Sequence, residues 1–185
     1  MAHFSKLDMY YLGQGTHYDI YKKLGAHPIT EKGKKGVYFA VWAPNAEKVS
    51  VIGTFNDWQT DADVMERLEP MGIYELFVPG ASVGDLYKFY IETPDGRQLY
   101  KADPYANYSE LRPGNASCVA DINAFKWSDG KWMEKRQTCK DVYSQPMAIY
   151  EVHPGSWMRH PGREDEGFYT YREFAIKLAE YVKEM

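Results

Sequence analysis

Between Val37 and Ile122 the chain alternates short apolar segments with residues that form tight turns, and this pattern limits the fold more than any other feature. The segments are rich in β-branched and aromatic residues and lie at 37–42, 48–52, 73–78, 86–91, 98–100 and 118–122. Turn-forming residues separate them, most clearly Pro-Asp-Gly at 94–96. Short strands at this spacing predict a mainly β fold, an immunoglobulin-like antiparallel β-sandwich of about a hundred residues.

The segments on either side of this pattern define four expected parts: an arm, the sandwich, a linker and the start of another domain, at 1–35, 36–123, 124–146 and 147–185. In the arm, residues 19–24 can form a short helix that ends at Gly25. The linker is polar, and we expect Trp127 and Trp132 to pack it.

The last part of the chain changes from strand spacing to helix spacing. Met147–Val152 reads as a strand, and Thr170 with Glu173 fits a capping box that opens a helix. Apolar residues then recur at spacings of three and four, on one helical face: Tyr171, Phe174, Ala175, Leu178, Tyr181 and Val182. One strand and one helix form no layer without a parallel neighbour. We therefore expect 147–185 to begin a second, larger domain that continues past Met185.

Charge and cysteine content argue against several functional classes. The formal net charge is −4, and no run of Lys or Arg exceeds two residues, which disfavours nucleic-acid binding. The longest apolar run, Val37–Ala43, is too short to span a membrane, and the N-terminus does not resemble a signal peptide. Cys118 and Cys139 make no metal-binding spacing and no disulfide framework. We expect a soluble cytoplasmic protein with no metal and no cofactor.

The sequence GTFNDW at 53–58 follows the second predicted strand and carries two aromatic rings. Gly53 permits an unusual backbone angle, and the polar pair before Trp58 suits a turn that projects this ring outward. An exposed indole offers a flat face to the C–H groups of a pyranose ring. Alternation on the strand at 86–91 places Lys88 and Tyr90 on one face, where Lys88 can join Trp58. Alternatively, both rings of GTFNDW simply close the edge of the sandwich.

The chain resembles a known family through an ordered series of motifs. GTFNDW, then YKFYI, the PDG turn and KADPYA resemble the N-terminal sandwich of the α-amylase superfamily, a glycogen-binding, isoamylase-N-terminal type of carbohydrate-binding module. GTHYDIYKKLGAHP at 15–28, FAVWAPNAEKVSVIGTFNDW at 39–58 and IYEVHPGSW at 149–157 are similar to the 1,4-α-glucan (glycogen) branching enzymes. The resemblance implies a sandwich followed by a (β/α)8 barrel, which begins with the strand at 147–152 and the helix from Thr170.

The resemblance also implies site residues. Trp58 matches the main stacking tryptophan, Lys88 the lysine beside it, and Asn115 a sugar-binding asparagine. Tyr100 stands near the place where binding modules have a second tryptophan, so the platform looks weaker. His153 and Trp157 would lie in a loop on the substrate side of the barrel. None of the catalytic motifs of the superfamily occurs, so no catalytic residue is assigned.

Three functions follow as hypotheses. The first is an α-glucan-binding module of a branching enzyme, non-catalytic by itself, whose ligands are glycogen, amylose and maltooligosaccharides and which packs on its own catalytic barrel. The second is a structural spacer that binds no sugar. The third is the module of an α-glucan debranching hydrolase.

Overall fold

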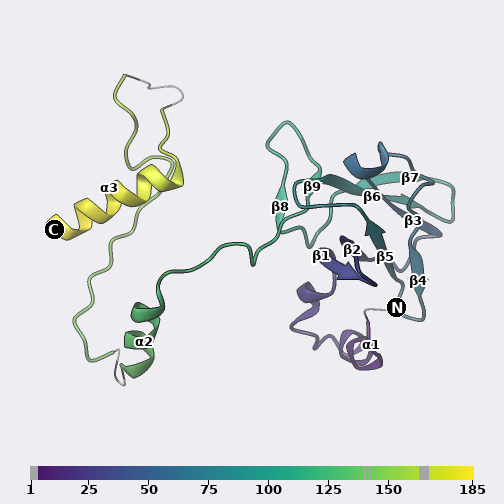
Figure 1. Ribbon diagram of the computed structural model, residues 1–185, viewed down its shortest axis with the longest axis horizontal. Helices are drawn as coiled ribbons and strands as arrows, with labels where there is room; N and C mark the ends of the chain where they lie inside the picture. The colour runs from purple at the N-terminus through teal and green to yellow at the C-terminus, as the bar shows by residue number, and fades with distance from the viewer. Residues whose placement is uncertain (1–3, 140, 142, 163–166) are drawn as a thin grey trace. The chain divides into compact units, whose positions relative to one another are not determined.

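The computed structural model of the chain describes residues 4–139, 141, 143–162 and 167–185. The fold divides into two compact units, 1–126 and 127–185. Figure 1 shows that the labelled strands belong to the first unit, while helices α2 and α3 belong to the second.

The first unit contains two antiparallel sheets. The first sheet has the order β1-β2-β5-β4, with β1 at Gly25–Glu31, β2 at Lys34–Trp42, β5 at Ile73–Pro79 and β4 at Glu66–Leu68. The second has the order β3-β6-β9-β8, with β3 at Lys48–Gly53, β6 at Leu86–Glu92, β9 at Ser117–Cys118, β8 at Tyr108–Ser109, and β7 at Gln98–Lys101 paired to β6. The predicted antiparallel sandwich is confirmed.

The main core lies between the two sheets and follows the predicted alternation. Tyr87 and Phe89 of β6 are fully buried in it, as are Val49 and Val51 of β3. Lys88 lies between Tyr87 and Phe89 in the sequence and is only partly buried. Because successive side chains of a strand point to opposite faces, Lys88 lies on the outer face of the second sheet.

A second apolar cluster covers another set of residues of the first sheet. Tyr38, Ala40 and Ile73 of β2 and β5 are buried there together with Phe4 and Leu24. The segment that contributes the last two residues carries α1 (Lys6–Gly13) and a single 3-10 turn, η1 (Ile20–Lys22), where the sequence predicted a short helix. Helix α1 was not predicted from the sequence. The segment from Phe4 to Leu24 is thus packed on the sheet through its two ends.

Strand β1 was also not predicted, although it lies within the range expected to be an arm. It pairs with β2 from Gly25 to Glu31, and Lys32 and Gly33 form the turn between the two strands with positive φ angles of 48° and 79°. Left-handed backbone at both positions of a two-residue loop matches the twist of a hairpin.

The described part of the second unit contains two helices and lacks the strand expected at 147–152. Residues 147–152 have no strand conformation. A parallel strand needs neighbours on which to place its backbone hydrogen bonds, and the residues described here supply none for 147–152. Helix α3 (Tyr171–Glu184) does form where predicted: Thr170 N donates to Glu173 Oε2 at 2.8 Å, and Thr170 Oγ1 accepts from Glu173 N at 3.4 Å, completing the capping box.

The segment expected to be a linker contains helix α2 (Gly130–Thr138). The side chains of Trp127 and Trp132 are largely exposed, at 78% and 58%, and the Arg136 guanidinium lies over the Trp132 ring at 5.4 Å from its centroid. The two cysteines are free thiols; Cys118 is buried and Cys139 is exposed.

Candidate functional site

The GTFNDW turn gives its two aromatic rings different positions. Phe55 lies in the 3-10 turn η2 (Thr54–Asn56), packs against the main core and contacts the Phe39 ring at a centroid distance of 5.5 Å. Trp58 has an exposed fraction of 38%, as the turn residues predicted. Phe55 therefore anchors the turn, and Trp58 remains available for contact.

The backbone that presents Trp58 is unusual. Asp57 and Trp58 both have left-handed φ angles, 53° and 60°. This region costs an L-residue other than glycine about 1–2 kcal/mol, so two in succession persist only where surrounding contacts enforce them. One such contact is the hydrogen bond from Trp58 N to Gly53 O, at 3.0 Å.

Gly53 is required by a close approach between β3 and β6. A Cβ atom at this position would lie 2.3 Å from the Leu86 carbonyl oxygen and 2.7 Å from the Phe55 ring. Both distances are below van der Waals contact, so a larger residue would displace the strand or the ring. The glycine thus brings the base of the turn against β6.

Lys88 and Asn115 lie together on the second sheet. Lys88 Nζ donates a hydrogen bond to Asn115 Oδ1. Lys88 also pairs with Ile52 in the register of β6 and β3, and Ile52 directly precedes Gly53, the base of the Trp58 turn. The structure therefore brings the predicted lysine and asparagine into contact and places them beside the strand from which the Trp58 turn begins.

Tyr100 lies on β7, opposite Tyr90 of β6. The two rings meet edge to face at a centroid distance of 5.3 Å; Tyr90 is buried, and Tyr100 has an exposed fraction of 55%. Tyr90 therefore acts as a buried support for the exposed Tyr100 ring. The alternation placed Tyr90 on the outer face, but only the pairing of β6 with β7 gives it this contact.

The loop at 153–157 makes contacts within the second unit. The His153 ring lies 3.1 Å from Ser156 Oγ, and Trp157 Nε1 donates to the Tyr150 hydroxyl at 2.7 Å. The Trp157 ring also packs edge to face on Phe174 of α3 at 5.5 Å. Trp157 is thus a packing residue for α3, whereas His153 is exposed.

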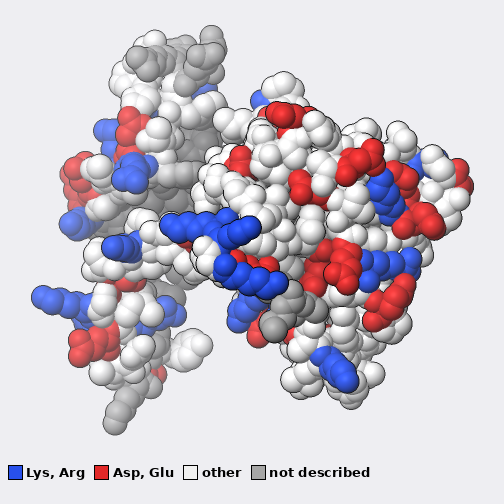
Figure 2. Space-filling model, turned by 45° about the vertical axis from the view of Figure 1, so that its right-hand side comes forward, with Lys and Arg blue, Asp and Glu red and all other residues white. Residues whose placement is uncertain are grey.

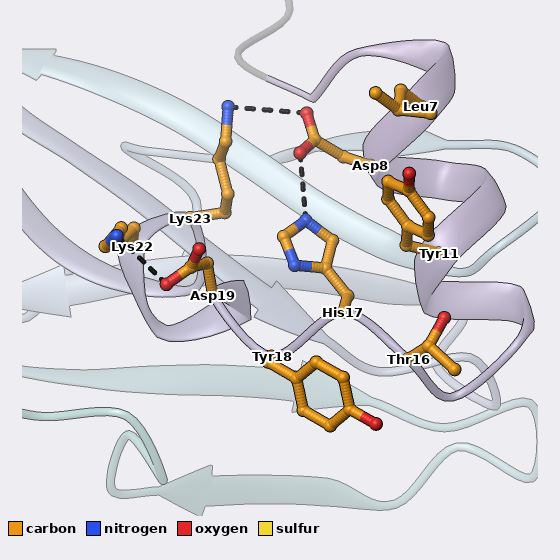
Figure 3. Close-up of a pocket in the computed structure, with 9 residues that line it drawn as sticks. All are labelled: Leu7, Asp8, Tyr11, Thr16, His17, Tyr18, Asp19, Lys22 and Lys23. Carbon is orange, nitrogen blue, oxygen red and sulfur yellow. Dashed lines mark hydrogen bonds and ion pairs between the residues drawn. The ribbon is translucent and has the colours of Figure 1, made fainter.

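A cavity of about 330 Å³ lies at the N-terminal segment and is lined by none of the residues predicted to bind sugar (Figure 3). Asp8 of α1 lines it and accepts hydrogen bonds at 2.9 Å from His17 and at 2.7 Å from the backbone N of Ser5, and it forms an ion pair with Lys23 at 3.3 Å. Partial burial disfavours the charged form of Asp8. The contacts with Ser5, His17 and Lys23 outweigh this effect and lower the pKa of Asp8 well below its usual range. This network joins α1 to the segment before β1.

The charge distribution agrees with the low net charge. Figure 2 shows blue Lys and Arg side chains near the centre of the view with red Asp and Glu side chains beside them, so both signs of charge occur together on this face. Within the described parts of the chain, no group of three or more His, Cys, Asp and Glu residues is placed to hold a metal ion.

Among the residues described, no helix is long and apolar enough to cross a membrane.

Comparison with known proteins identifies the sandwich. Residues 23–106 match carbohydrate-binding module 48, the isoamylase N-terminal domain. The sandwich belongs to this family. The match runs from just before β1 to just after β7, so it includes GTFNDW and Lys88, while Asn115 follows it.

Relatives that match nearly the whole chain are branching enzymes. The 1,4-α-glucan branching enzyme GlgB of Butyrivibrio fibrisolvens is 61% identical over 98% of this chain and 28% of its own length. GlgB of Gloeobacter violaceus is 49% identical over 98% of the chain and 25% of its length. Among solved structures, a type I pullulanase of Bacillus subtilis complexed with maltose aligns with 57% of the chain and 14% of its own, at 27% identity and a TM-score of 0.45. The resemblance to branching enzymes is confirmed, and the chain spans about a quarter of the length of these GlgB relatives.

Proposed function

We propose that the module binds α-glucan chains through Trp58, Lys88 and Asn115, with Tyr100 as a secondary contact. The observation that carries this proposal is the exposed Trp58 ring on a turn that leaves β3 next to the Lys88–Asn115 pair. Glycogen, amylose and maltooligosaccharides are the expected ligands.

The chemistry of these groups suits a sugar ring. The indole face of Trp58 offers an apolar surface to pyranose C–H groups. The Lys88 ammonium donates hydrogen bonds, and the Asn115 amide both donates and accepts, which matches hydroxyl groups that do both. In the free module Lys88 and Asn115 bond each other, so they are held in position before a sugar arrives.

We further propose that the chain is the N-terminal part of a branching enzyme, which cuts α-1,4-glucan chains and rejoins the pieces through α-1,6 linkages. Such retaining chemistry needs two carboxyl groups roughly 5 Å apart. In this proposal both belong to residues beyond this chain. Residues 147–185 then begin the (β/α)8 barrel on which the module packs, α3 is its first helix, and His153 and Trp157 lie in a loop on its substrate side.

A test of sugar binding is affinity electrophoresis in gels with and without glycogen. We expect glycogen to retard the chain and Trp58→Ala to abolish the retardation. Trp132→Ala is the matched control, because it removes an exposed indole from the second unit. Equal mobility of the unmutated chain in both gels would favour the spacer function, in which the module only supports the rest of the enzyme.

A test of the reaction is an assay of the full-length enzyme on amylose. Branching adds α-1,6 linkages with little release of reducing sugar. A debranching hydrolase would instead leave linear amylose unchanged and would release reducing ends from the α-1,6 linkages of glycogen, so glycogen is assayed in parallel.

A further inference from the structure

Asn56 uses both of its side-chain polar atoms within the GTFNDW turn. Its Oδ1 accepts from Gly53 N at 2.9 Å, and its Nδ2 donates to Val51 O at 3.0 Å and to Asp63 Oδ2 at 2.7 Å. The side chain is partly buried. These three bonds tie the turn to the strand that precedes it and to the segment that follows it.

Asn56 and Trp58 are connected through one residue. Gly53 N donates to the Asn56 side chain, and Gly53 O accepts from Trp58 N at 3.0 Å. The carbonyl of Asn56 also accepts from Gln59 N at 3.1 Å, on the other side of Trp58. Asn56 is therefore bonded to Gly53 and to Gln59, and Gly53 is itself bonded to Trp58. These bonds hold the backbone on both sides of Asp57 and Trp58, the two residues with left-handed φ angles.

Asp63 connects the same network to the edge of β3. Its carbonyl accepts from Val51 N at 3.0 Å, while its carboxylate accepts from Asn56. Met65 N then donates to Val49 O at 2.9 Å, so this segment runs along β3. The segment between Gly53 and Asp63, which carries Trp58, is thus hydrogen-bonded to β3 at both of its ends. The Asn56 side chain connects these two ends, through Gly53 and Asp63.

We propose that Asn56 is a positioning residue for the sugar contact of Trp58, acting through Gly53 and Asp63. The proposal rests on the function proposed above, because it assumes that Trp58 is a sugar contact. Left-handed backbone at two successive non-glycine residues persists only where neighbouring contacts hold it, and the Asn56 bonds are the side-chain contacts within this turn that do so. Loss of these bonds leaves the indole attached but free to leave its binding orientation.

The test exchanges the partners of one hydrogen bond. Asn56→Asp removes the donor to Val51 and Asp63 and places two carboxylates side by side. We therefore expect the apparent dissociation constant for glycogen, measured by affinity electrophoresis, to rise about tenfold. Adding Asp63→Asn to Asn56→Asp restores a donor to the pair, so the double variant should recover most of the loss. Asn123→Asp, at an exposed position past β9, is the control for the added negative charge.

Labelling with 5-fluorotryptophan reports on the ring independently of sugar. The resonance of Trp58 is assigned by its loss in Trp58→Phe. We expect Asn56→Asp to shift or broaden this resonance, the double variant to restore it, and the resonance of Trp132 to stay unchanged. The midpoint of thermal unfolding, measured for each variant, separates a loosened turn from an unfolded module.

The outcomes separate the two proposals. If Trp58→Ala abolishes retardation but Asn56→Asp binds as the unmutated chain does, Asn56 has no positioning role and the proposed function stands. A double variant that stays as weak as Asn56→Asp, with a normal unfolding midpoint, also overturns the role. If Trp58→Ala leaves retardation unchanged, the proposed function fails first, and the role of Asn56 in sugar binding fails with it.

Discussion

Lys88 Nζ donates a hydrogen bond to Asn115 Oδ1, which joins the outer face of β6 to the residues before β9. The two residues lie 27 positions apart in the sequence. Their contact exists because β9 pairs with the start of β6, Leu86 opposite Cys118 and Tyr87 opposite Ser117. The sheet thus assembles a donor and an amide near the strand from which the Trp58 turn begins.

Removing the Lys88 ammonium should weaken glucan binding. Lys88→Met keeps the apolar stem but loses the charged donor, so we expect the apparent dissociation constant for glycogen to rise about tenfold. Lys34→Met removes an exposed charge at the β1–β2 hairpin and should leave binding unchanged. Affinity electrophoresis at several glycogen concentrations measures both dissociation constants. Equal constants for the two variants would show that Lys88 is not a sugar contact.

Substitution of Gly53 should destabilise the module. Gly53→Ala places a methyl group 2.3 Å from the Leu86 carbonyl oxygen, and this overlap should cost about 2 kcal/mol of unfolding free energy. Gly130→Ala is the control, because its added Cβ meets no atom within 4 Å. Urea unfolding measures both. A Gly53→Ala module as stable as the unmutated chain would show that β3 and β6 separate without cost.

The carboxyl group of Asp103 should make the stability of the module depend on pH. Asp103 is buried; it accepts from the Tyr87 hydroxyl at 2.6 Å and from Tyr105 N at 2.8 Å. Burial raises its pKa, against the lowering effect of these hydrogen bonds. The folded state therefore keeps the proton where the unfolded chain has lost it, and the unfolding free energy falls as the pH rises from about 4 through the raised pKa.

Asp103→Asn tests this dependence. We expect the unfolding free energy of the variant to fall less steeply with pH than that of the unmutated chain, measured by urea unfolding in steps between pH 4 and pH 8. Asp121→Asn, at an exposed position, should keep the original slope. Identical slopes for Asp103→Asn and the unmutated chain would contradict the raised pKa.

Asp8 should have the opposite pH dependence. Because its pKa is lowered in the folded state, its stabilising contribution is present at neutral pH and is lost as the pH falls below about 4. Asp8→Asn removes the ion pair with Lys23 and weakens the bond with His17, so we expect faster amide exchange in α1 at pH 7. The difference from the unmutated chain should narrow as the pH is lowered toward 3. A difference that stays constant with pH would contradict the charged network.

The elements that could be predicted from sequence have a local signal. Alternation placed Tyr87 and Phe89 inside and Lys88 outside, and the turn residues predicted an exposed Trp58. The capping box at Thr170 likewise located the start of α3.

The elements that were missed depend on distant contacts. Phe4 and Leu24 become buried only because the N-terminal segment packs on the first sheet. No periodic pattern of apolar residues around either of them predicts this contact. Strand β8 spans two residues, too few for an alternation to be visible, and the strand predicted at 118–122 is reduced to β9, with which it shares only Cys118. The strand predicted at Met147–Val152 had the right composition but lacks a partner strand among the residues described. The contact between Lys88 and Asn115 has no sequence signal of its own; Asn115 was singled out by family resemblance.

The most direct test of sugar binding by Trp58 is an NMR titration of the chain with maltoheptaose, observing the indole N–H resonances. The Trp58 resonance is assigned by its loss in Trp58→Phe, and the Trp132 resonance serves as an internal reference. We predict that the Trp58 resonance shifts progressively and reaches saturation while that of Trp132 stays in place. A Trp58 resonance that does not move at millimolar maltoheptaose would contradict the assignment of this ring as the glucan contact.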